Sequence, residues 1–500
     1  MRVAPLPRPA GSRMYKPTRT ISGVSPIAVV VEPRKCPHGT CVYCPSWDVP
    51  QSYTPKSPAI MRAARLNYDP YPQMTSRLAA FEAMGHPTDK VELIVMGGTF
   101  LAYPLDYQYN FIKRCYDALN GKAGEGKGAK DLEEAKRINE TTKHRCVAMC
   151  LETRPDFCGP EEIKRMLDFG ATRCEIGVQL PDDEIYALVK RGHTVADVKK
   201  ATKLLKEAGF KVGYHLMPGL PGSDTERDLT RFEEIFASED FMPDQIKIYP
   251  TLVIKGSELE KWYAEGKYTP YTEKDIVELT IKLKSLVPKW CRIMHIMRII
   301  PPEYLVAGST RSDLRKVTQA EMKTRGIKCQ CIRCREVGFA ERQKKDTSGE
   351  LKLETLSYDA SGGKEYFLSF VNPNDFIFGL CRLRINEKKE DGKSVAMLRE
   401  LHVFGPEMRI GAEDGEGRKT QHKGLGAKLM AEAERIAAEY GCERMDVISG
   451  IGVREYYRNL GYTLKGHYMV KTLATEERNS GTAGKPAAKR RRGPTKRGKE

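Results

Sequence analysis

Three cysteines near the N-terminus have a spacing suited to chemistry. Cys36, Cys41 and Cys44 follow the apolar run 27–32, which predicts a β-strand. Three thiolates can hold three irons of a four-iron cluster and leave the fourth iron open. Because an open iron can bind a substrate or cofactor, we interpret the triplet as a site for one-electron chemistry. A zinc ion with His38 as a further ligand and a set of buried free thiols are the alternatives.

A second cysteine group lies further along the chain. Cys329, Cys331 and Cys334 fall within six residues, which predicts a structural zinc site between two domains. Such a site needs a fourth ligand, for which Cys291 and His295 are the candidates. A thiol-rich turn without metal is the alternative. The cysteines outside the two groups are expected to be small buried hydrophobes: Cys115, Cys146, Cys150, Cys158, Cys174, Cys291, Cys381 and Cys442.

A glycine pattern near the C-terminus is the third chemical signal. Gln421, Gly424 and Gly426 lie at the start of an amphipathic helix expected at 423–440. Glycines let a backbone approach a ligand closely, and the free N–H groups of a helix start bind phosphate. An ordinary glycine turn is the alternative.

Alternating strands and helices must position the thiol triplet. The expected strands are 27–32, 91–96, 146–151, 173–179, 211–217 and 245–249. The expected helices include 161–169, 195–207, 225–236 and 273–286. This alternation predicts an α/β fold with a parallel sheet, and six such units form an incomplete (β/α)6 barrel. Polar residues gather at the expected carboxyl ends of the strands, where barrels carry their chemistry: Gly97–Thr99, Glu152–Pro155, Gln179, His215 and Lys247–Pro250.

The pattern changes between residues 310 and 350. Residues 375–385 alternate polar and apolar side chains and predict a half-exposed strand, and 396–403 and 445–449 predict further strands. We therefore expect a separate α+β domain. The expected organisation is a basic arm (1–20), a barrel domain (21–315), a zinc-binding linker (316–350), the α+β domain (351–475) and a disordered basic tail (476–500).

Composition narrows the class of protein. The chain has 500 residues, enough for two or more domains, and its net charge of +17 favours a nucleic-acid partner. Nine Lys and Arg and no acid lie in 478–499, which act either as a nucleic-acid arm or as a solubilising end. No apolar run is long enough to span a membrane, and the N-terminus has no signal-peptide core, so we expect a cytoplasmic protein.

Motifs along most of the chain resemble one known family. They are the thiol triplet, Gln51–Thr54, Met61–Ala63, Asp89–Phe100, Glu152–Pro155, Arg191–Thr194, His215–Gly222, Lys247–Ile254 and Glu400–Val403 onward to Met469. In these segments, from about 20 to 475, the chain resembles the catalytic subunit of Elongator in its archaeal and bacterial form. That family joins a radical-SAM barrel to a GNAT acetyltransferase domain and modifies the wobble uridine of tRNA.

The resemblance implies cofactors and a reaction. The triplet would hold a [4Fe-4S] cluster whose open iron binds S-adenosyl-L-methionine (SAM), and reductive cleavage would give a deoxyadenosyl radical. This radical would activate the methyl group of acetyl-CoA, and the carbon radical would attack C5 of uridine 34 in the anticodon loop. Hydrolysis of the thioester would leave 5-carboxymethyluridine. An electron donor is required, and a homodimer is one expected assembly.

The resemblance also implies the acetyl-CoA contacts. These are Lys90 in the barrel domain and Glu400, Leu401, His402, Val403, Leu425, Gly426, Ala427 and Tyr457 in the GNAT domain. Tyr456 and Tyr457 are expected near the acyl group, where they stack or donate hydrogen bonds. The chain departs from many radical-SAM enzymes in having Gly97-Gly98-Thr99 where they have Gly-Gly-Glu, and from the Elongator family in its short N-terminal region.

Three other functions stay open at this point. One is a protein lysine acetyltransferase whose radical-SAM domain is only a scaffold. The second is a non-catalytic tRNA-binding module, and the third is a radical-SAM enzyme for a small molecule, which the basic charge disfavours. The sequence leaves open the tRNA species, the electron donor, the fourth zinc ligand and the need for partner subunits.

Overall fold

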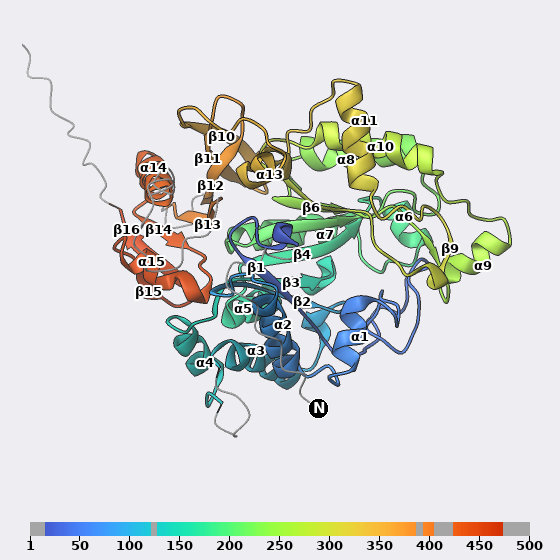
Figure 1. Ribbon diagram of the computed structural model, residues 1–500, viewed down its shortest axis with the longest axis horizontal. Helices are drawn as coiled ribbons and strands as arrows, with labels where there is room; N and C mark the ends of the chain where they lie inside the picture. The colour runs from blue at the N-terminus through green and yellow to red at the C-terminus, as the bar shows by residue number, and fades with distance from the viewer. Residues whose placement is uncertain (1–15, 122–127, 387–393, 405–423, 474–500) are drawn as a thin grey trace, which may run out of the picture.

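A parallel sheet forms the centre of the first domain. The computed structural model describes residues 16–121, 128–386, 394–404 and 424–473. Seven strands pair in parallel in chain order: β1 (Ser25–Val30), β2 (Lys90–Met96), β3 (Arg145–Thr153), β4 (Arg173–Gln179), β5 (Lys211–Leu216), β6 (Gln245–Ile248) and β8 (Arg292–Ile296). The sheet curls into an open half-barrel with β1 and β8 at its edges (Figure 1). The incomplete barrel is confirmed.

Helices cover the outer face of this sheet (Figure 1). They are α1 (Pro58–Ala64), α2 (Pro70–Ala83), α3 (Leu105–Leu119), α4 (Leu132–Asn139), α5 (Pro160–Phe169), α6 (Asp183–Leu188), α7 (Val195–Glu207), α8 (Thr225–Ala237) and α10 (Glu273–Leu286). Helix α7 has the predicted bounds because local chemistry sets its start: Thr194 and Asp197 form a reciprocal capping box. No helix in the described ranges is long and apolar enough to cross a membrane.

The strand β8 is absent from the sequence prediction. It contains Arg292 and His295 in five residues, so its polar content hides the strand pattern. A short antiparallel pair, β7 (Val253–Ile254) and β9 (Leu305–Ala307), and α9 (Glu258–Ala264) lie beyond the main sheet. Between the domains lie α11 (Leu314–Thr324), α12 (Ile332–Arg335) and α13 (Val337–Arg342).

A second seven-stranded sheet forms the C-terminal domain. Its order is β10 (Lys352–Ala360), β11 (Gly363–Val371), β12 (Ile377–Asn386), β13 (Ala396–Val403), β14 (Arg444–Val447), β16 (Tyr468–Thr472) and β15 (Thr463–Lys465). The pair β13–β14 is parallel and the others are antiparallel. Helix α14 (Leu425–Glu439) packs against β12 and β13, and α15 (Arg454–Arg458) follows β14.

The prediction of a half-exposed strand at 375–385 is wrong. Strand β12 is buried along nearly its whole length. Its alternating polar residues, Arg382 and Arg384, face the first domain instead of solvent, and both side chains are fully buried. A period-two pattern separates two faces of a strand, but it does not say whether the polar face meets water or another domain.

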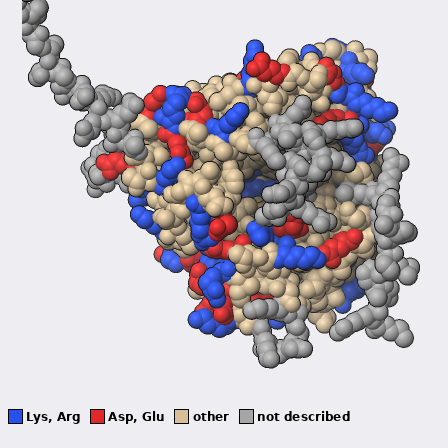
Figure 2. Space-filling view, turned by 60° about the vertical axis from the view of Figure 1, so that its left-hand side comes forward, with Lys and Arg blue, Asp and Glu red and all other residues tan. Residues whose placement is uncertain are grey.

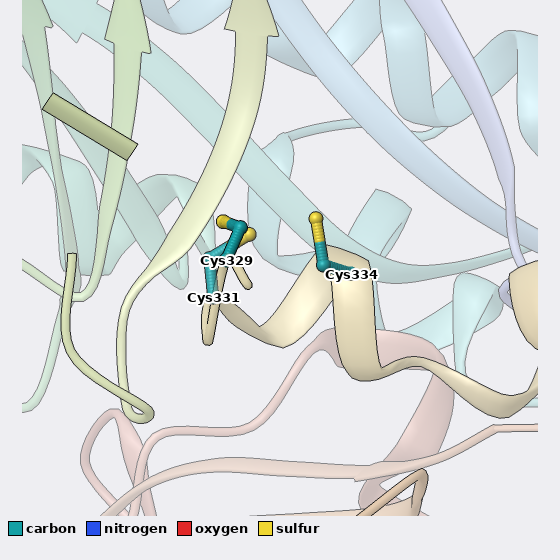
Figure 3. Close-up of side chains that lie close together, drawn as sticks. All are labelled: Cys329, Cys331 and Cys334. Carbon is teal, nitrogen blue, oxygen red and sulfur yellow. The ribbon is translucent and has the colours of Figure 1, made fainter. Parts of the chain in front are cut away.

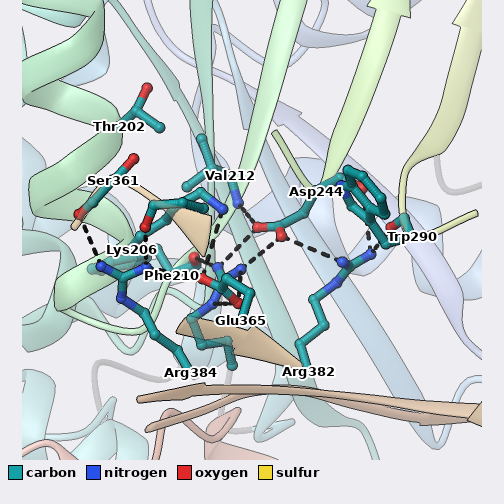
Figure 4. Close-up of polar contacts among 12 residues, drawn as sticks. Thr202, Lys206, Phe210, Val212, Asp244, Trp290, Ser361, Glu365, Arg382 and Arg384 are labelled. Atoms are coloured by element: carbon teal, nitrogen blue, oxygen red, sulfur yellow. Dashed lines mark hydrogen bonds and ion pairs between the residues drawn. The ribbon is translucent and has the colours of Figure 1, made fainter. Parts of the chain in front are cut away.

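Buried ion pairs join the two domains (Figure 4). Arg399 of β13 donates to both oxygens of Asp244, which precedes β6, at 2.7 and 2.9 Å. Arg382 lies 3.4 Å from Asp244 and donates to the carbonyl of Trp290 at 2.5 Å. Glu365 of β11 accepts from Arg399 at 3.0 Å and lies 3.6 Å from the Lys206 ammonium. The two domains therefore meet through buried side chains of opposite charge.

Removing Arg399 from this network should destabilise the protein strongly. Arg399→Met leaves Asp244 buried and without its bidentate partner, which should cost about 3–5 kcal/mol in the free energy of unfolding. Denaturant unfolding monitored by circular dichroism measures the loss. Arg435→Met, which breaks an exposed pair with Glu432, is the matched control and should leave the midpoint nearly unchanged. Equal midpoints for the two variants would contradict this role.

Lys206 makes the network sensitive to pH. Burial, with Arg399 and Arg384 nearby, lowers the pKa of Lys206 to about 8, and its Nζ finds no hydrogen-bond partner among the described residues. The unfolded chain binds this proton up to its ordinary pKa of 10.5, so stability should rise between about pH 8 and pH 10.5. Lys206→Met should remove that rise and stabilise the protein at pH 7, by about 3 kcal/mol at most. Melting temperatures of both proteins at pH 7 and pH 10 test this; a stabilisation equal at both pH values would contradict it.

Candidate active site

The thiol triplet lies in the loop after β1, at the carboxyl edge of the half-barrel. Cys41 and Cys44 are buried, and Cys36 is partly exposed. Gln51 donates to the Cys44 sulfur at 3.1 Å, and Arg191 donates to the Cys41 sulfur at 3.6 Å. These contacts favour negative charge on the sulfurs.

The surroundings of the triplet are basic. Burial, Arg154 and Arg191 lower the pKa of His38 to about 4, so its ring is neutral near pH 7. Burial raises the pKa of Cys44 to about 12, so a metal that binds there must displace its proton. Within the described part of the chain, neither ring nitrogen of the buried His193 has a hydrogen-bond partner. A buried basic site with three thiols suits an anionic group, and an iron–sulfur cluster held by thiolates is such a group.

The separation of the sulfurs distinguishes the two cysteine groups. Within the described part of the chain, Cys329, Cys331 and Cys334 have sulfur atoms all within 4.8 Å of one another, close enough for a single ion. The triplet at 36–44 does not form such a group. The wider spacing fits a group larger than one ion.

Glycines bring the second strand close to the triplet. A Cβ on Gly97 would lie 2.5 Å from a methyl group of Val31, and its φ of 127° disfavours any other residue. Thr99 follows and hydrogen-bonds to Cys36, which helps lower the pKa of that thiol against the effect of its burial. The Gly97–Thr99 turn therefore lies beside the triplet.

Charged side chains fill the lumen of the half-barrel between its ends. Lys247 pairs with Glu175 and lies 3.2 Å from Glu152, and His215 Nε2 lies 2.9 Å from Glu175. Burial alone would raise the pKa of Glu175, but Lys247 and Arg173 lower it well below its usual value. The strand-end positions of Glu152, His215 and Lys247 are visible in the sequence. Glu175 lies inside the buried strand β4. The only sign of it in the sequence is an acidic residue within a predicted buried strand.

The glycine turn begins α14. Gly424 caps the helix with a φ of 86°, and a Cβ there would meet nothing within 4 Å, so ligand atoms can approach. A Cβ on Gly426 would lie 2.7 Å from the Tyr456 hydroxyl, which places Tyr456 over the turn. Tyr456 is partly exposed, whereas Tyr457 is buried. Leu425 is buried and Ala427 is exposed on the first turn; Gln421 lies outside the described residues.

The expected acyl-binding strand β13 contacts the first domain. The Glu400 carboxylate pairs with Lys211 and, at 2.7 Å, with Arg382, so its side chain serves the domain interface. His402 Nε2 lies 2.7 Å from the carbonyl oxygen of Ser22. Leu401 and Val403, half-buried, pack against the core of the second domain.

The two candidate sites lie at opposite ends of the half-barrel. The triplet follows the carboxyl end of β1, whereas β13 contacts Lys211, which begins β5, and Ser22, which precedes β1. Lys90 begins β2 at this same amino edge. The charged group of Lys247, Glu175 and Glu152 comes from the strands between these two edges.

The second cysteine group lies where the domains meet (Figure 3). Cys331 caps α12, and Ile332 donates to the carbonyl of Cys291 at 3.0 Å. Hydrogen bonds from Cys329 and Cys331, with Lys284 nearby, lower the pKa of Cys334. Among the described residues, neither Cys291 nor His295 joins the group of three sulfurs, so neither candidate supplies the fourth ligand in this arrangement.

Three family models match successive parts of the chain. The Radical SAM superfamily matches residues 33–232, the Radical_SAM C-terminal domain matches 243–324, and the Acetyltransferase (GNAT) family matches 342–462. The chain is thus built from radical-SAM and GNAT segments. A radical-SAM domain implies SAM and an iron–sulfur cluster, and a GNAT domain implies acetyl-CoA.

Relatives that match more than nine tenths of the chain agree with the family models. The chain is 52% identical to a tRNA uridine(34) acetyltransferase of Dehalococcoides mccartyi, over 92% of this chain and 100% of that protein. It is 42% identical to human Elongator complex protein 3, over 92% of this chain and 86% of that protein. A solved structure of Methanocaldococcus infernus Elp3 with an N-terminal deletion is 45% identical, has a TM-score of 0.78, and covers 91% of this chain and 100% of its own. The chain belongs to the family of Elongator complex protein 3 and the tRNA uridine(34) acetyltransferases, in which a radical-SAM domain precedes a GNAT domain.

Proposed function

We propose that this protein forms 5-carboxymethyluridine at uridine 34 of tRNA from acetyl-CoA by SAM-dependent radical chemistry. The names of the relatives support tRNA uridine 34 as the target. Acetyl-CoA and SAM follow from the two kinds of domain. The carboxymethyl product is the part that this proposal adds.

The contact between β13 and the barrel carries the proposal. Glu400 and His402 of the acyl-binding strand face Lys211 and Ser22 of the radical-SAM domain. An acetyltransferase that served free lysine side chains would need this strand open to solvent. A strand that faces the barrel instead suits an acyl group that reacts inside the barrel.

The residues of the carboxyl edge would act on the cofactors. Cys36, Cys41 and Cys44 would hold the cluster, and Arg154 and Arg191 would balance its negative charge. The bound cluster and SAM supply one-electron chemistry that generates a hydrogen-abstracting radical. Because Cys41 and Cys44 are buried while Cys36 is partly exposed, the chain shields most of the site from water and leaves one side for an electron donor.

Lys247, held by Glu175 and Glu152 in the lumen of the half-barrel, would orient the reactants. Burial alone would lower the pKa of Lys247, but Glu175 and Glu152 raise it well above its usual value, so the ammonium stays charged. It can donate a hydrogen bond to a carbonyl oxygen of the acyl group or of the uracil ring while the carboxylates hold it in place. At the other end, the free N–H groups at the start of α14 would bind coenzyme A phosphates, and the Tyr456 hydroxyl lies over that turn.

Replacing Cys36, Cys41 and Cys44 together by Ala should abolish both the brown cluster absorbance and the modified uridine. The reason is that no thiolate remains to hold the irons. Anaerobic incubation with tRNA, acetyl-CoA, SAM and a reductant, followed by mass spectrometry of nucleosides, measures the product. Cys442→Ala, which removes a buried thiol of the GNAT domain, is the control and should keep both signals. Modified uridine in the triple variant, or acetylated lysine peptide formed without SAM, would overturn the proposal.

We also propose that Cys329, Cys331 and Cys334 hold a structural zinc ion. Their sulfurs lie within 4.8 Å of one another, and the lowered pKa of Cys334 supplies a thiolate. A fourth ligand is needed, for which water or a residue brought in by a small movement serves. Zinc here would fix the linker between the domains.

Metal analysis separates the two cysteine groups. Purified wild-type protein should contain about one zinc per chain in addition to iron. The Cys329→Ala/Cys334→Ala variant should lose zinc, keep iron and melt at a lower temperature, whereas the Cys36/Cys41/Cys44 variant should lose iron and keep zinc. Unchanged zinc in the first variant would contradict the assignment.

A further inference from the structure

Three arginines from separate segments converge on one patch without acidic partners. Arg19 belongs to the short helix η1 (Pro17–Arg19), Arg62 to α1 and Arg77 to α2. The guanidinium carbons of Arg19 and Arg77 lie 5.8 and 5.1 Å from the centre of the Phe81 ring. None of the ion pairs among the described residues includes these three side chains, which we call the arginine patch.

The arrangement is costly for the isolated protein. Partial burial, with Arg62 and Arg19 nearby, lowers the pKa of Arg77 to about 10, and burial together with Arg19 lowers the pKa of Arg62. Two acids in the neighbourhood are used elsewhere, since Glu82 pairs with Lys143 and Asp69 pairs with Arg114. Like charges held together, with no acidic counter-ion among the described residues, favour binding of an anion there.

On another face of the protein, basic side chains have acidic neighbours. Figure 2 shows a face on which basic side chains lie beside acidic ones. Several cations elsewhere on the helices have acidic partners, as Arg435 has in Glu432 and Lys164 has in Asp168. The arginine patch differs from these sites because Arg19 and Arg77 lie against one aromatic ring, that of Phe81.

The patch lies on the helices that pack against the outside of β1. Ile60 and Ala63 of α1 pack against Val30, the last residue of β1, and Cys36 lies in the loop that follows that strand. Arg62 lies between those two packed residues in the sequence and is exposed. The patch therefore extends from α1, which packs near the carboxyl end of β1, along α2 toward the amino edge, where Phe81 contacts His86.

We propose that Arg19, Arg62 and Arg77 bind the phosphodiester backbone of the substrate RNA. This rests on the proposed function, because the anticodon stem-loop supplies consecutive phosphates around a base that enters the barrel. Arginine suits this role, since its planar guanidinium donates two hydrogen bonds to one phosphate. Contacts to phosphate position an RNA without reading its sequence.

The test compares binding of tRNA to two triple variants of the full chain. Arg19→Gln/Arg62→Gln/Arg77→Gln should raise Kd about tenfold and make the slope of log K against log salt less steep by about 2, because about three phosphate contacts are lost. The control Arg137→Gln/Lys164→Gln/Arg435→Gln removes the same charge from ion-paired sites and should change both quantities little. Fluorescence anisotropy of labelled tRNA over a salt series measures them.

Further measurements distinguish a loss of RNA binding from a loss of folding. Cluster absorbance and acetyl-CoA binding should be unchanged in the patch variant, and Arg62→Gln alone, at an exposed position, should reproduce about a third of the slope change if the triple variant folds poorly. A patch variant with wild-type affinity and slope, or a control with an equal loss, overturns the arginine patch while leaving the proposed function intact. A wild-type protein that binds no tRNA overturns both.

Discussion

The buried pairing of Arg399 with Asp244 is the interaction on which the rest of the structure depends. It joins β13 of the GNAT domain to the loop that precedes β6 of the half-barrel, and both side chains are fully buried. A buried charge cannot be left unpaired, so the two domains cannot separate without a large free-energy cost. The network around it therefore fixes one relative position of the domains, and with it the position of β13, the strand proposed to bind the acyl group.

That fixed position gives the proposed chemistry its geometry. The thiol triplet and the glycine turn lie nearly the whole chain apart, yet β13 contacts the amino edge of the sheet whose carboxyl edge bears the triplet. Between them the lumen contains Lys247 with its two carboxylates. Fixed charges in a site shielded from water act without first having to reorganise. The arginine patch beside α1 would then hold the RNA backbone while one base enters.

Local signals in the sequence predicted much of the half-barrel. Helix α7 has the predicted bounds because Thr194 and Asp197 cap it, and the strand pattern located most of the half-barrel. Strand β8 was not predicted because its arginine and histidine hide a strand pattern. Strand β12 was predicted as half-exposed because alternation cannot distinguish water from a neighbouring domain. Glu175 was missed because its partners Lys247 and His215 come from other strands.

The sequence by itself determined the chemistry available to this protein: thiols spaced for a cluster, a glycine turn at a helix start and an excess of positive charge. Residue types, spacing and local turns are encoded over a few neighbouring residues, so a linear pattern reveals them. Only the tertiary structure decided which of these groups meet. It turned Arg382, Arg384 and Glu400 from expected surface or ligand-binding residues into an interface, and it left Arg62 and Arg77 outside the ion pairs that the described residues form. The physical reason is that burial and charge pairing depend on segments far apart in the chain, which come together only when both domains have folded.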